Sequence, residues 1–202
     1  MKQHTFLGAV LGAMICSSTA WAAEPGDAAP AFSVKNTKGE EVTLASQKGK
    51  VVVLEWVNYE CPFVKKHYGS GNIPKLQEKY TGKDVVWISV NSAAEDQQGY
   101  LAGADLAARS EKEGNKASQV VLDTDGKVGK AYGAKTTPQL VVIDKEGKVA
   151  YNGAIDSKDT TDVADIETAD SYISDALDAV LAGKTVEKAK TKPYGCGVKY
   201  GK

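Results

Sequence analysis

Cys61 has the residue type and the sequence setting of a nucleophile. It stands between an apolar stretch, residues 51–57, and a predicted helix over residues 63–68. A thiol at a helix N-terminus faces backbone amides and the positive end of the helix dipole, and both favour the thiolate. We therefore expect attack by sulfur at Cys61. A cysteine that is merely packed, or held in a permanent disulfide, is the structural alternative.

Glu55 is the second residue that can take part in chemistry, because it lies inside the apolar stretch six residues before Cys61. A carboxylate among apolar neighbours is poorly solvated, so its pKa is expected to rise. A carboxyl group of that kind can accept a proton from a nearby thiol. The alternative is a glutamate at the end of a strand whose side chain reaches solvent.

The bond between Thr137 and Pro138 is a candidate cis peptide bond. It comes immediately before the apolar stretch QLVVID, residues 139–144. X-Pro bonds adopt the cis form far more often than other bonds, although trans remains commoner. Taken alone, this feature indicates only a turn in front of a strand.

Residues 1–22 have the pattern of a secretory signal peptide. A basic residue precedes an apolar run over residues 6–15, and the segment ends in Ala-Trp-Ala, which fits a signal peptidase site. The run is shorter than the roughly 20 residues that span a bilayer. We expect cleavage after Ala22 and export to a compartment where disulfides persist, such as a bacterial periplasm. A retained membrane anchor is the alternative.

Composition excludes several classes of protein. The chain has 202 residues with 25 Lys+Arg against 26 Asp+Glu, and 42% of its residues are hydrophobic. These values are typical of a globular domain and exclude disordered, collagen-like and disulfide-dense chains. Arg109 is the single arginine and no basic stripe occurs, so nucleic acid is not an expected partner. Beyond Ala22 the cysteines are Cys61 and Cys196, which form a candidate pair.

The elements that must position these residues follow from the hydrophobic pattern. Apolar runs alternate with helical patterns, which predicts an α/β fold in which a mixed β-sheet carries helices on both faces. The pattern indicates a hairpin around Lys38-Gly39, strands over residues 51–57, 84–90, 119–123, 139–144 and 148–153, and helices over 63–68, 73–80, 100–112, 128–132 and 162–181.

The remaining polar features have simple structural interpretations. His67 lies about 240° round the helix from Cys61, so the two side chains should point apart and His67 should lie at the surface. A metal site built from Cys61, His67 and Cys196 offers only three ligands and is not expected. The C-terminal segment, residues 184–202, is rich in lysine without helical periodicity, which indicates a solvated tail. The lysines expected to be solvated are Lys184, Lys188, Lys190 and Lys192.

Together these motifs resemble the redoxin families of the thioredoxin fold. The stretch VVVLEWVNYECPFV is similar to their first active-site strand and helix, and Thr137-Pro138 to their cis-proline loop. The similarity extends over residues 25–183. It is strongest to an exported, peroxiredoxin-like group with a Cys-Pro-Phe-Val motif, which also carries a Cys-x-Val-Lys-Tyr tail. The N-terminal part of the resemblance comprises Gly26, Pro30, Phe32, Gly39, Leu44, Gly49 and Lys50.

The resemblance implies a role for each candidate residue. Cys61 matches the nucleophilic first cysteine of Cys-x-x-Cys, Glu55 the buried acid, and Pro138 the cis proline packed against the reactive sulfur. Val64 replaces the second cysteine, so a resolving thiol has to come from elsewhere. Cys196 can supply it, because about 15 residues of extended chain reach roughly 45–50 Å.

The sequence departs from the peroxidatic pattern of peroxiredoxins. Asn58 and Leu54 stand where those proteins place Thr or Ser and Pro before the cysteine. Their peroxide-polarising arginine falls on Pro138, and Arg109 lies on another element. Efficient peroxidase chemistry is therefore not implied.

The expected protein is an exported thiol-disulfide oxidoreductase in which Cys61 attacks and Cys196 resolves. The alternatives are a peroxiredoxin-like peroxidase and a non-catalytic binding module with a structural Cys61–Cys196 disulfide. Neither an organic cofactor nor a metal is required, and the partners are thiols and disulfides with an external thiol as electron donor. We expect a signal peptide at 1–22, a thioredoxin-like domain at 23–183 and a tail at 184–202.

Overall fold

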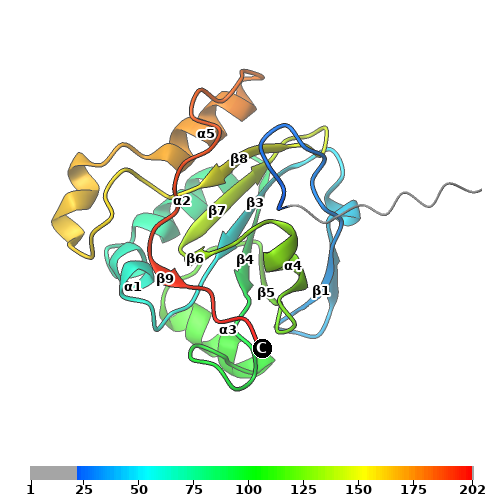
Figure 1. The fold of residues 1–202 in the computed structure, drawn as a ribbon, viewed down its shortest axis with the longest axis vertical. Coiled ribbons are helices and arrows are strands. Elements are labelled where there is room, and N and C mark those ends of the chain that lie inside the picture. The colour runs from blue at the N-terminus through cyan, green and yellow to red at the C-terminus, as the bar shows by residue number, and fades with distance from the viewer. Residues whose placement is uncertain (1–21, 202) are drawn as a thin grey trace, which may run out of the picture.

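The structure, a computed structural model, describes residues 22–201. The predicted signal peptide therefore lies outside the described residues, apart from Ala22. A seven-stranded mixed sheet runs through the centre of the molecule in the order β2-β1-β5-β4-β3-β7-β8 (Figure 1). Its strands are β1 (Ser33–Asn36), β2 (Glu41–Thr43), β3 (Val51–Trp56), β4 (Val85–Asn91), β5 (Gln119–Leu122), β7 (Gln139–Ile143) and β8 (Val149–Gly153).

The β3 strand lies between two neighbours and is covered on both faces. It pairs in parallel with β4 and antiparallel with β7, and all six of its residues are buried. Val51 and Val53 point to one apolar cluster, whereas Val52 and Leu54 point to a second on the opposite face. This arrangement explains why the sequence is apolar at consecutive positions rather than at alternate ones.

Helices cover the two faces unequally. The first cluster contains buried residues of α1 (Pro62–Gly69), α2 (Asn72–Thr81), α3 (Gly103–Lys112) and α5 (Tyr172–Leu181). The second contains residues of α4 (Lys127–Ala131) together with the β1–β2 hairpin. The predicted mixed sheet with helices on both faces is confirmed, and the predicted elements before residue 154 are present with end shifts of up to three residues.

The predicted helix over residues 162–181 is wrong in its first half. A 3₁₀ helix, η2 (Val163–Thr168), comes first, and α5 starts only after an extended backbone at Ala169. The chain turns there because the amides of Asp170 and Ile173 bond to the segment that follows β8. Val163 is consequently half exposed, and the buried face of the helix begins at Ile173.

The C-terminal segment is ordered on the domain rather than solvated as a whole. The lysines at 184, 188, 190 and 192 are exposed, as predicted, but Val186 and Tyr194 are buried. The segment passes β8 and forms β9 (Cys196–Gly197), which pairs antiparallel with β6 (Thr136–Thr137) as a second, two-stranded sheet (Figure 1). The prediction of a solvated tail was wrong because hydrophobic periodicity reports only on the tail itself. It does not reveal that β6, in another part of the chain, can pair with the tail as a strand.

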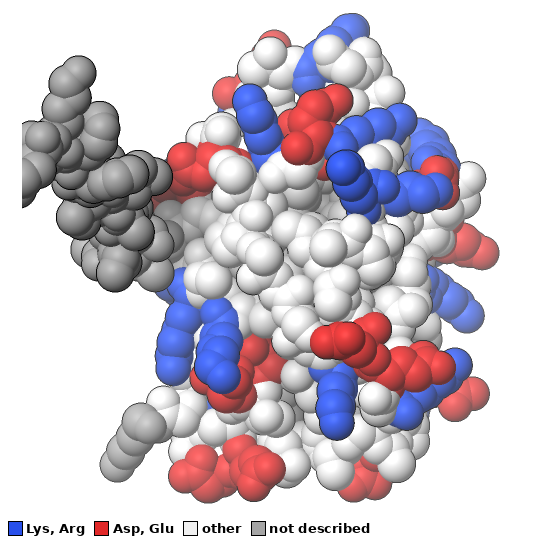
Figure 2. Space-filling view, turned by 90° about the vertical axis from the view of Figure 1, so that its right-hand side faces the viewer, with Lys and Arg blue, Asp and Glu red and all other residues white. Residues whose placement is uncertain are grey.

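The surface agrees with the near-neutral composition. Basic and acidic side chains are interspersed on the face that Figure 2 shows, without a continuous basic stripe. Within residues 22–201, no helix combines the length and the apolar character that crossing a membrane demands.

Candidate active site

Cys61 occupies the N-cap position of α1, with extended backbone at φ −72° and ψ 126°. Its carbonyl accepts the first hydrogen bond of the helix from the Lys65 amide, and Pro62 follows at the first helical position. Proline is suited to that position because it has no amide hydrogen to satisfy and its φ angle already matches the helix. The predicted placement of Cys61 at the start of a helix is confirmed.

The sulfur of Cys61 is buried yet surrounded by polar groups. Only 2% of the residue is exposed, and as a thiol it donates to the carbonyl oxygen of Thr137 over 3.1 Å. Burial alone would raise the pKa of Cys61. The polar surroundings that Cys196, Thr137 and the Val64 amide provide outweigh burial and hold the pKa of Cys61 below its ordinary value. The site therefore favours the Cys61 thiolate.

Cys196 is brought to Cys61 by strand pairing. In the β6–β9 pair, Cys196 faces Thr137, the residue whose carbonyl oxygen contacts the Cys61 thiol. Burial, together with the hydrogen bond to Cys61 and the charge on it, raises the pKa of Cys196 to about 11. The two free thiols therefore differ in character, with Cys61 the better nucleophile and Cys196 the better proton carrier.

Gly195 allows this close approach of the tail. Its φ angle is +121°, a conformation that residues with a side chain rarely adopt. A Cβ atom built on Gly195 would lie 2.1 Å from the carbonyl oxygen of Thr137. Position 195 therefore needs glycine for both the backbone angle and the space.

Pro138 lies next to Thr137 at the site. The bond between Thr137 and Pro138 is cis, as the resemblance to the redoxin families implied, and Pro138 directly follows β6. Cys61, Cys196 and the loop before Pro138 thus come from three different parts of the chain and meet at Thr137. The structure brings together three of the four predicted site residues.

Glu55, the fourth, lies on β3 and is completely buried. Burial raises its pKa, although four side chains donate hydrogen bonds to its carboxylate. Among the described residues it makes no hydrogen bond with either cysteine, and its link to α1 is the Tyr68 hydroxyl, 2.8 Å from Oε1. The donors are Tyr68, Gln77, Trp87 and Ser89.

The predicted surface position of His67 is wrong, because its side chain is fully buried. The C-terminal segment covers the face of α1 that would otherwise meet solvent. Tyr194 and Asp156 lie against the ring, with Tyr194 Oη 3.3 Å from Nε2. Burial lowers the pKa of His67 to about 4, despite the nearby Asp156 carboxylate.

The sequence did not single out Tyr194 or Asp156, which belong to the surroundings of Cys196. Tyr194 precedes Cys196 by two residues, and this spacing is the one signal that could have drawn attention to it. Asp156 lies in the segment after β8, where no sequence motif marks it. Its proximity to the site is therefore evident only from the structure.

Arg109 is engaged next to the site rather than in it. Its guanidinium bonds to Glu60 and Glu113, each at 2.7 Å, and donates to the carbonyl of Tyr59. The Arg109 hydrogen bond lowers the pKa of Glu60. The positive charge of Arg109 also offsets the negative charge of Glu60 beside the Cys61 thiolate.

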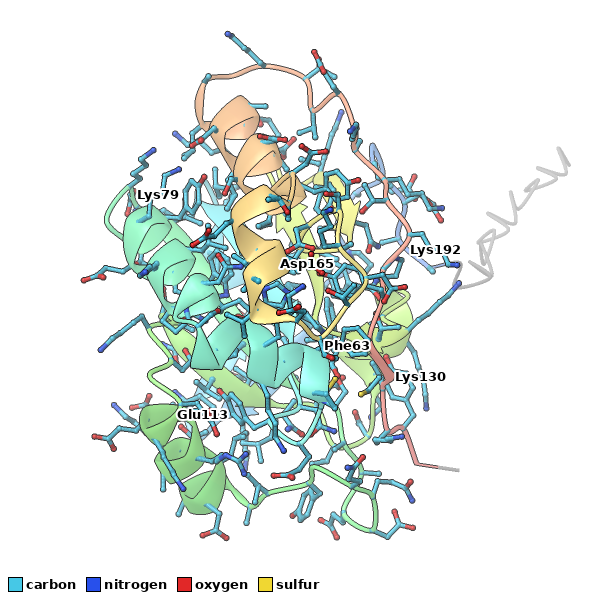
Figure 3. The ribbon with its side chains drawn as sticks, turned by 90° about the vertical axis from the view of Figure 1, so that its left-hand side faces the viewer. Phe63, Lys79, Glu113, Lys130, Asp165 and Lys192 are labelled. Atoms are coloured by element: carbon cyan, nitrogen blue, oxygen red, sulfur yellow. The ribbon has the colours of Figure 1, made fainter. Side chains whose placement is uncertain are left out.

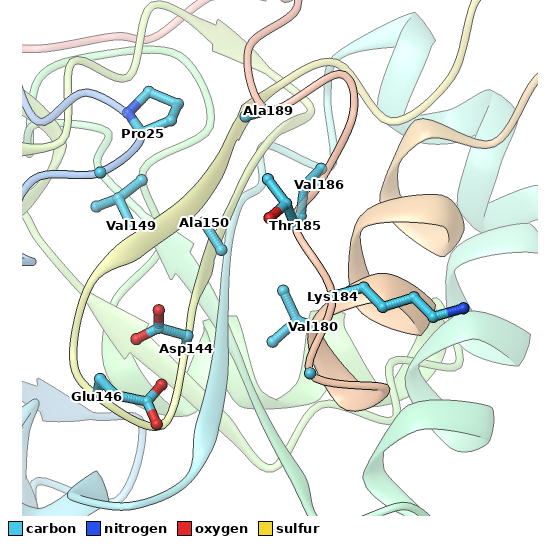
Figure 4. Close-up of a pocket in the computed structure, with 12 residues that line it drawn as sticks. Pro25, Asp144, Glu146, Val149, Ala150, Val180, Lys184, Thr185, Val186 and Ala189 are labelled. Carbon is cyan, nitrogen blue, oxygen red and sulfur yellow. The ribbon is translucent and has the colours of Figure 1, made fainter.

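A surface pocket of about 560 Å³ lies elsewhere, between the β7–β8 hairpin, the end of α5 and the start of the tail (Figure 4). Its polar lining includes Asp144, Glu146 and Lys184 but neither cysteine. The pocket therefore has no part in thiol chemistry at Cys61.

Comparison with known proteins identifies the family. The Redoxin family matches residues 24–169. The thiol-disulfide oxidoreductase ResA of Bacillus thuringiensis subsp. konkukian is 29% identical over 128 residues, which cover 62% of this chain and 67% of that protein.

Solved structures show the same fold. The crystal structure of an uncharacterized conserved protein from Geobacillus kaustophilus superposes with a TM-score of 0.73 and 28% identity, over 88% of this chain and 92% of that one. The thioredoxin domain of a thiol-disulfide oxidoreductase from Bacteroides vulgatus superposes with a TM-score of 0.53 at 20% identity, over 73% and 98% of the two chains. The fold is therefore thioredoxin-like, and because the Redoxin match spans most of the chain, this protein belongs to the Redoxin family.

Proposed function

We propose that this protein is an exported thiol-disulfide oxidoreductase in which Cys61 is the nucleophile and Cys196 the resolving cysteine. The observation that carries the proposal is the β6–β9 pairing, which sets Cys196 opposite Thr137, the residue whose carbonyl oxygen lies 3.1 Å from the Cys61 sulfur. The name of the Bacillus relative, a thiol-disulfide oxidoreductase, supports the same chemistry.

The proposed reaction consists of two exchange steps. The Cys61 thiolate attacks a substrate disulfide, forms a mixed disulfide with one half and releases the other half as a thiolate. Cys196 then gives up its proton and attacks the Cys61 sulfur, which releases the second half with that proton. The product is a Cys61–Cys196 disulfide, and two electrons have passed to the substrate. Two equivalents of an external thiol reverse both steps and regenerate the enzyme.

Glu55 and Pro138 have supporting roles in the proposal. Glu55 accepts and returns a proton as Cys61 ionises, because burial raises the pKa of its carboxyl group and its hydrogen bond with Tyr68 ties it to α1, the helix that Cys61 caps. Pro138 fixes the loop whose Thr137 carbonyl faces the reactive sulfur. Export is supported by the signal-peptide pattern of residues 1–22.

The reaction of reduced protein with glutathione disulfide tests the two cysteine roles. A chain of residues 23–202 contains no other cysteine, so mass spectrometry can assign each product. We expect the unaltered chain to form the internal disulfide and release two glutathione molecules. Cys196→Ser should instead accumulate a Cys61–glutathione mixed disulfide, and Cys61→Ser should form neither product.

Two results would contradict these assignments. If Cys196→Ser reduces disulfides through repeated cycles as fast as the unaltered chain, Cys196 is not the resolving cysteine. If Cys61→Ser retains the exchange activity, the nucleophile lies elsewhere.

A further inference from the structure

Tyr194 anchors the C-terminal segment two residues before Cys196. Its side chain is buried, and its hydroxyl donates to Oδ1 of Asp156 over 2.5 Å. The ring packs against Phe63 with the centroids 5.7 Å apart. Figure 3 shows Phe63 on α1 beside the C-terminal segment. Tyr194 therefore attaches the tail both to α1 and to the segment that follows β8.

The polar contacts around the Tyr194 hydroxyl form a consistent chain of donors and acceptors. The Asn72 side-chain amide donates to Nδ1 of His67 over 2.9 Å, so the proton of the neutral ring lies on Nε2. That Nε2–H faces the Tyr194 oxygen at 3.3 Å, and the tyrosine hydroxyl in turn donates to Asp156. Because all four side chains have a defined orientation, the tyrosine has one favoured position.

The same two chain segments carry the anchor and the two thiols. On α1, Phe63 and His67 follow Cys61 by two and six residues. On the tail, Tyr194 is separated from Cys196 by Gly195 alone. Fixing Tyr194 against α1 consequently fixes how far Cys196 can move from Cys61.

We propose that Tyr194, held by Asp156, is a positioning residue that sets the effective concentration of the Cys196 thiol at Cys61. This inference rests on the proposed function, since it concerns the second exchange step. A tail that is already ordered in the reduced protein loses little further freedom when the disulfide forms. Loosening the tail lowers the effective concentration, which weakens the Cys61–Cys196 disulfide and slows its formation.

The test uses Tyr194→Phe, which keeps the ring and removes the bond to Asp156. The full-length chain carries Cys16→Ser in every sample, so that Cys61 and Cys196 are the remaining cysteines. Equilibration in glutathione buffers, followed by alkylation and mass spectrometry, measures the midpoint of the pair. We expect at least a tenfold loss of effective concentration, a midpoint about 30 mV less negative for this two-electron couple.

Two further variants separate positioning from general loss of structure. Tyr172→Phe removes a tyrosine hydroxyl from α5 and should leave the midpoint unchanged. Asp156→Ala should shift the midpoint in the same direction as Tyr194→Phe. The double variant should shift it no further than the larger single change, because both substitutions remove the same hydrogen bond, the one between Tyr194 and Asp156. Circular dichroism checks that each variant is folded.

The possible failures are distinguishable. A Tyr194→Phe midpoint equal to that of the Cys16→Ser reference overturns the positioning role while the internal disulfide, and with it the proposed function, stands. Additive shifts in the double variant also overturn it. A reference protein that forms no Cys61–Cys196 disulfide at any potential overturns the proposed function itself.

Discussion

The Sγ atom of Cys61 lies 3.1 Å from the carbonyl oxygen of Thr137, the residue that Cys196 faces across the β6–β9 pair. The backbone of Thr137 thus contacts the Cys61 thiol and pairs with Cys196. Because the tail binds this position as a strand, Cys196 reaches Cys61 through backbone pairing rather than through flexible approach. The approach of Cys196 to Cys61 therefore depends on that pairing.

Gly195→Ala should undock the strand that carries Cys196. The new Cβ atom would lie 2.1 Å from the Thr137 carbonyl oxygen, at a φ angle that disfavours alanine. We expect release of glutathione from a Cys61–glutathione mixed disulfide to slow at least tenfold in quench-flow experiments. Stability should fall by about 1–3 kcal/mol, the usual cost of such backbone strain.

Gly197→Ala provides a matched control two residues further along the chain, at the end of β9. Its Cβ atom would lie no closer than 4.0 Å to any neighbour, the Lys135 carbonyl oxygen, and its φ angle is ordinary. The rate of glutathione release should stay within about twofold of the original, since surface changes of this kind cost little. Equal rates for the two alanine variants would contradict the docked-strand account.

Cys196→Ala should raise the pKa of Cys61, because the neighbouring Cys196 thiol helps to hold that pKa below its ordinary value. Alkylation of Cys61 by iodoacetamide, followed over a range of pH, reports the thiolate fraction directly. The midpoint of that curve should move to higher pH than in the unaltered protein. An unchanged or lower midpoint would show that Cys196 does not stabilise the thiolate.

His67 should remain neutral at pH values where an exposed histidine titrates. Burial lowers its pKa from 6.5 to about 4, so the unfolded chain takes up the proton first as pH falls. The contribution of neutral His67 is complete above pH 6.5 and is lost between pH 6.5 and 4. It amounts to about 3 kcal/mol, since one pKa unit corresponds to about 1.4 kcal/mol.

Nuclear magnetic resonance can follow His67 alone in a chain of residues 23–202, which contains no other histidine. Its ring signals should show no titration between pH 5.5 and 8. Denaturant unfolding of the unaltered protein and His67→Gln gives the stability difference, which should shrink as pH falls from 6.5 to 4. A ring pKa near 6.5 would contradict the buried network around Tyr194.

Glu55 should affect stability with the opposite sign. Burial raises its pKa above 4.5 in the folded protein, so the native state holds this proton more tightly than the unfolded state. Its stabilising contribution is present below pH 4.5 and is lost as pH rises through the folded pKa. Relative to Glu55→Gln, the unaltered protein should lose unfolding free energy as pH increases above 4.5, as measured by urea denaturation.

The exchange kinetics of Glu55→Gln examine its proposed acid–base role. The variant should slow the reaction of Cys61 with glutathione disulfide and flatten the pH dependence of the rate, because glutamine cannot accept the proton. A pH profile identical to that of the unaltered protein would confine Glu55 to a structural role.

Local pattern was sufficient to predict the elements that hold Cys61, Glu55 and Pro138. The run of residues 51–57 is apolar at successive positions, which marks a strand covered on both faces, and Pro62 opens the helix that Cys61 caps. These features depend on neighbours in sequence, so the fold class and the position of Cys61 were available from the sequence.

The docking of the C-terminal segment could not be predicted from local sequence pattern. Cys196 meets Thr137 and Tyr194 meets Asp156 across long sequence separations, and nothing near either residue encodes the partner. His67 was assigned to the surface for the same reason, because the helix pattern shows which side it occupies but not what covers that side. The break at Ala169 likewise depends on bonds to the segment after β8.

The redox midpoint of the Cys61–Cys196 pair tests the central claim most directly. Residues 23–202 would be equilibrated in glutathione or dithiothreitol buffers, alkylated, and the pair quantified by mass spectrometry. We predict a reversible midpoint between about −120 and −270 mV, the range of exchange catalysts. A midpoint below about −300 mV, as in structural disulfides, or the absence of any Cys61–Cys196 bridge, would contradict the account.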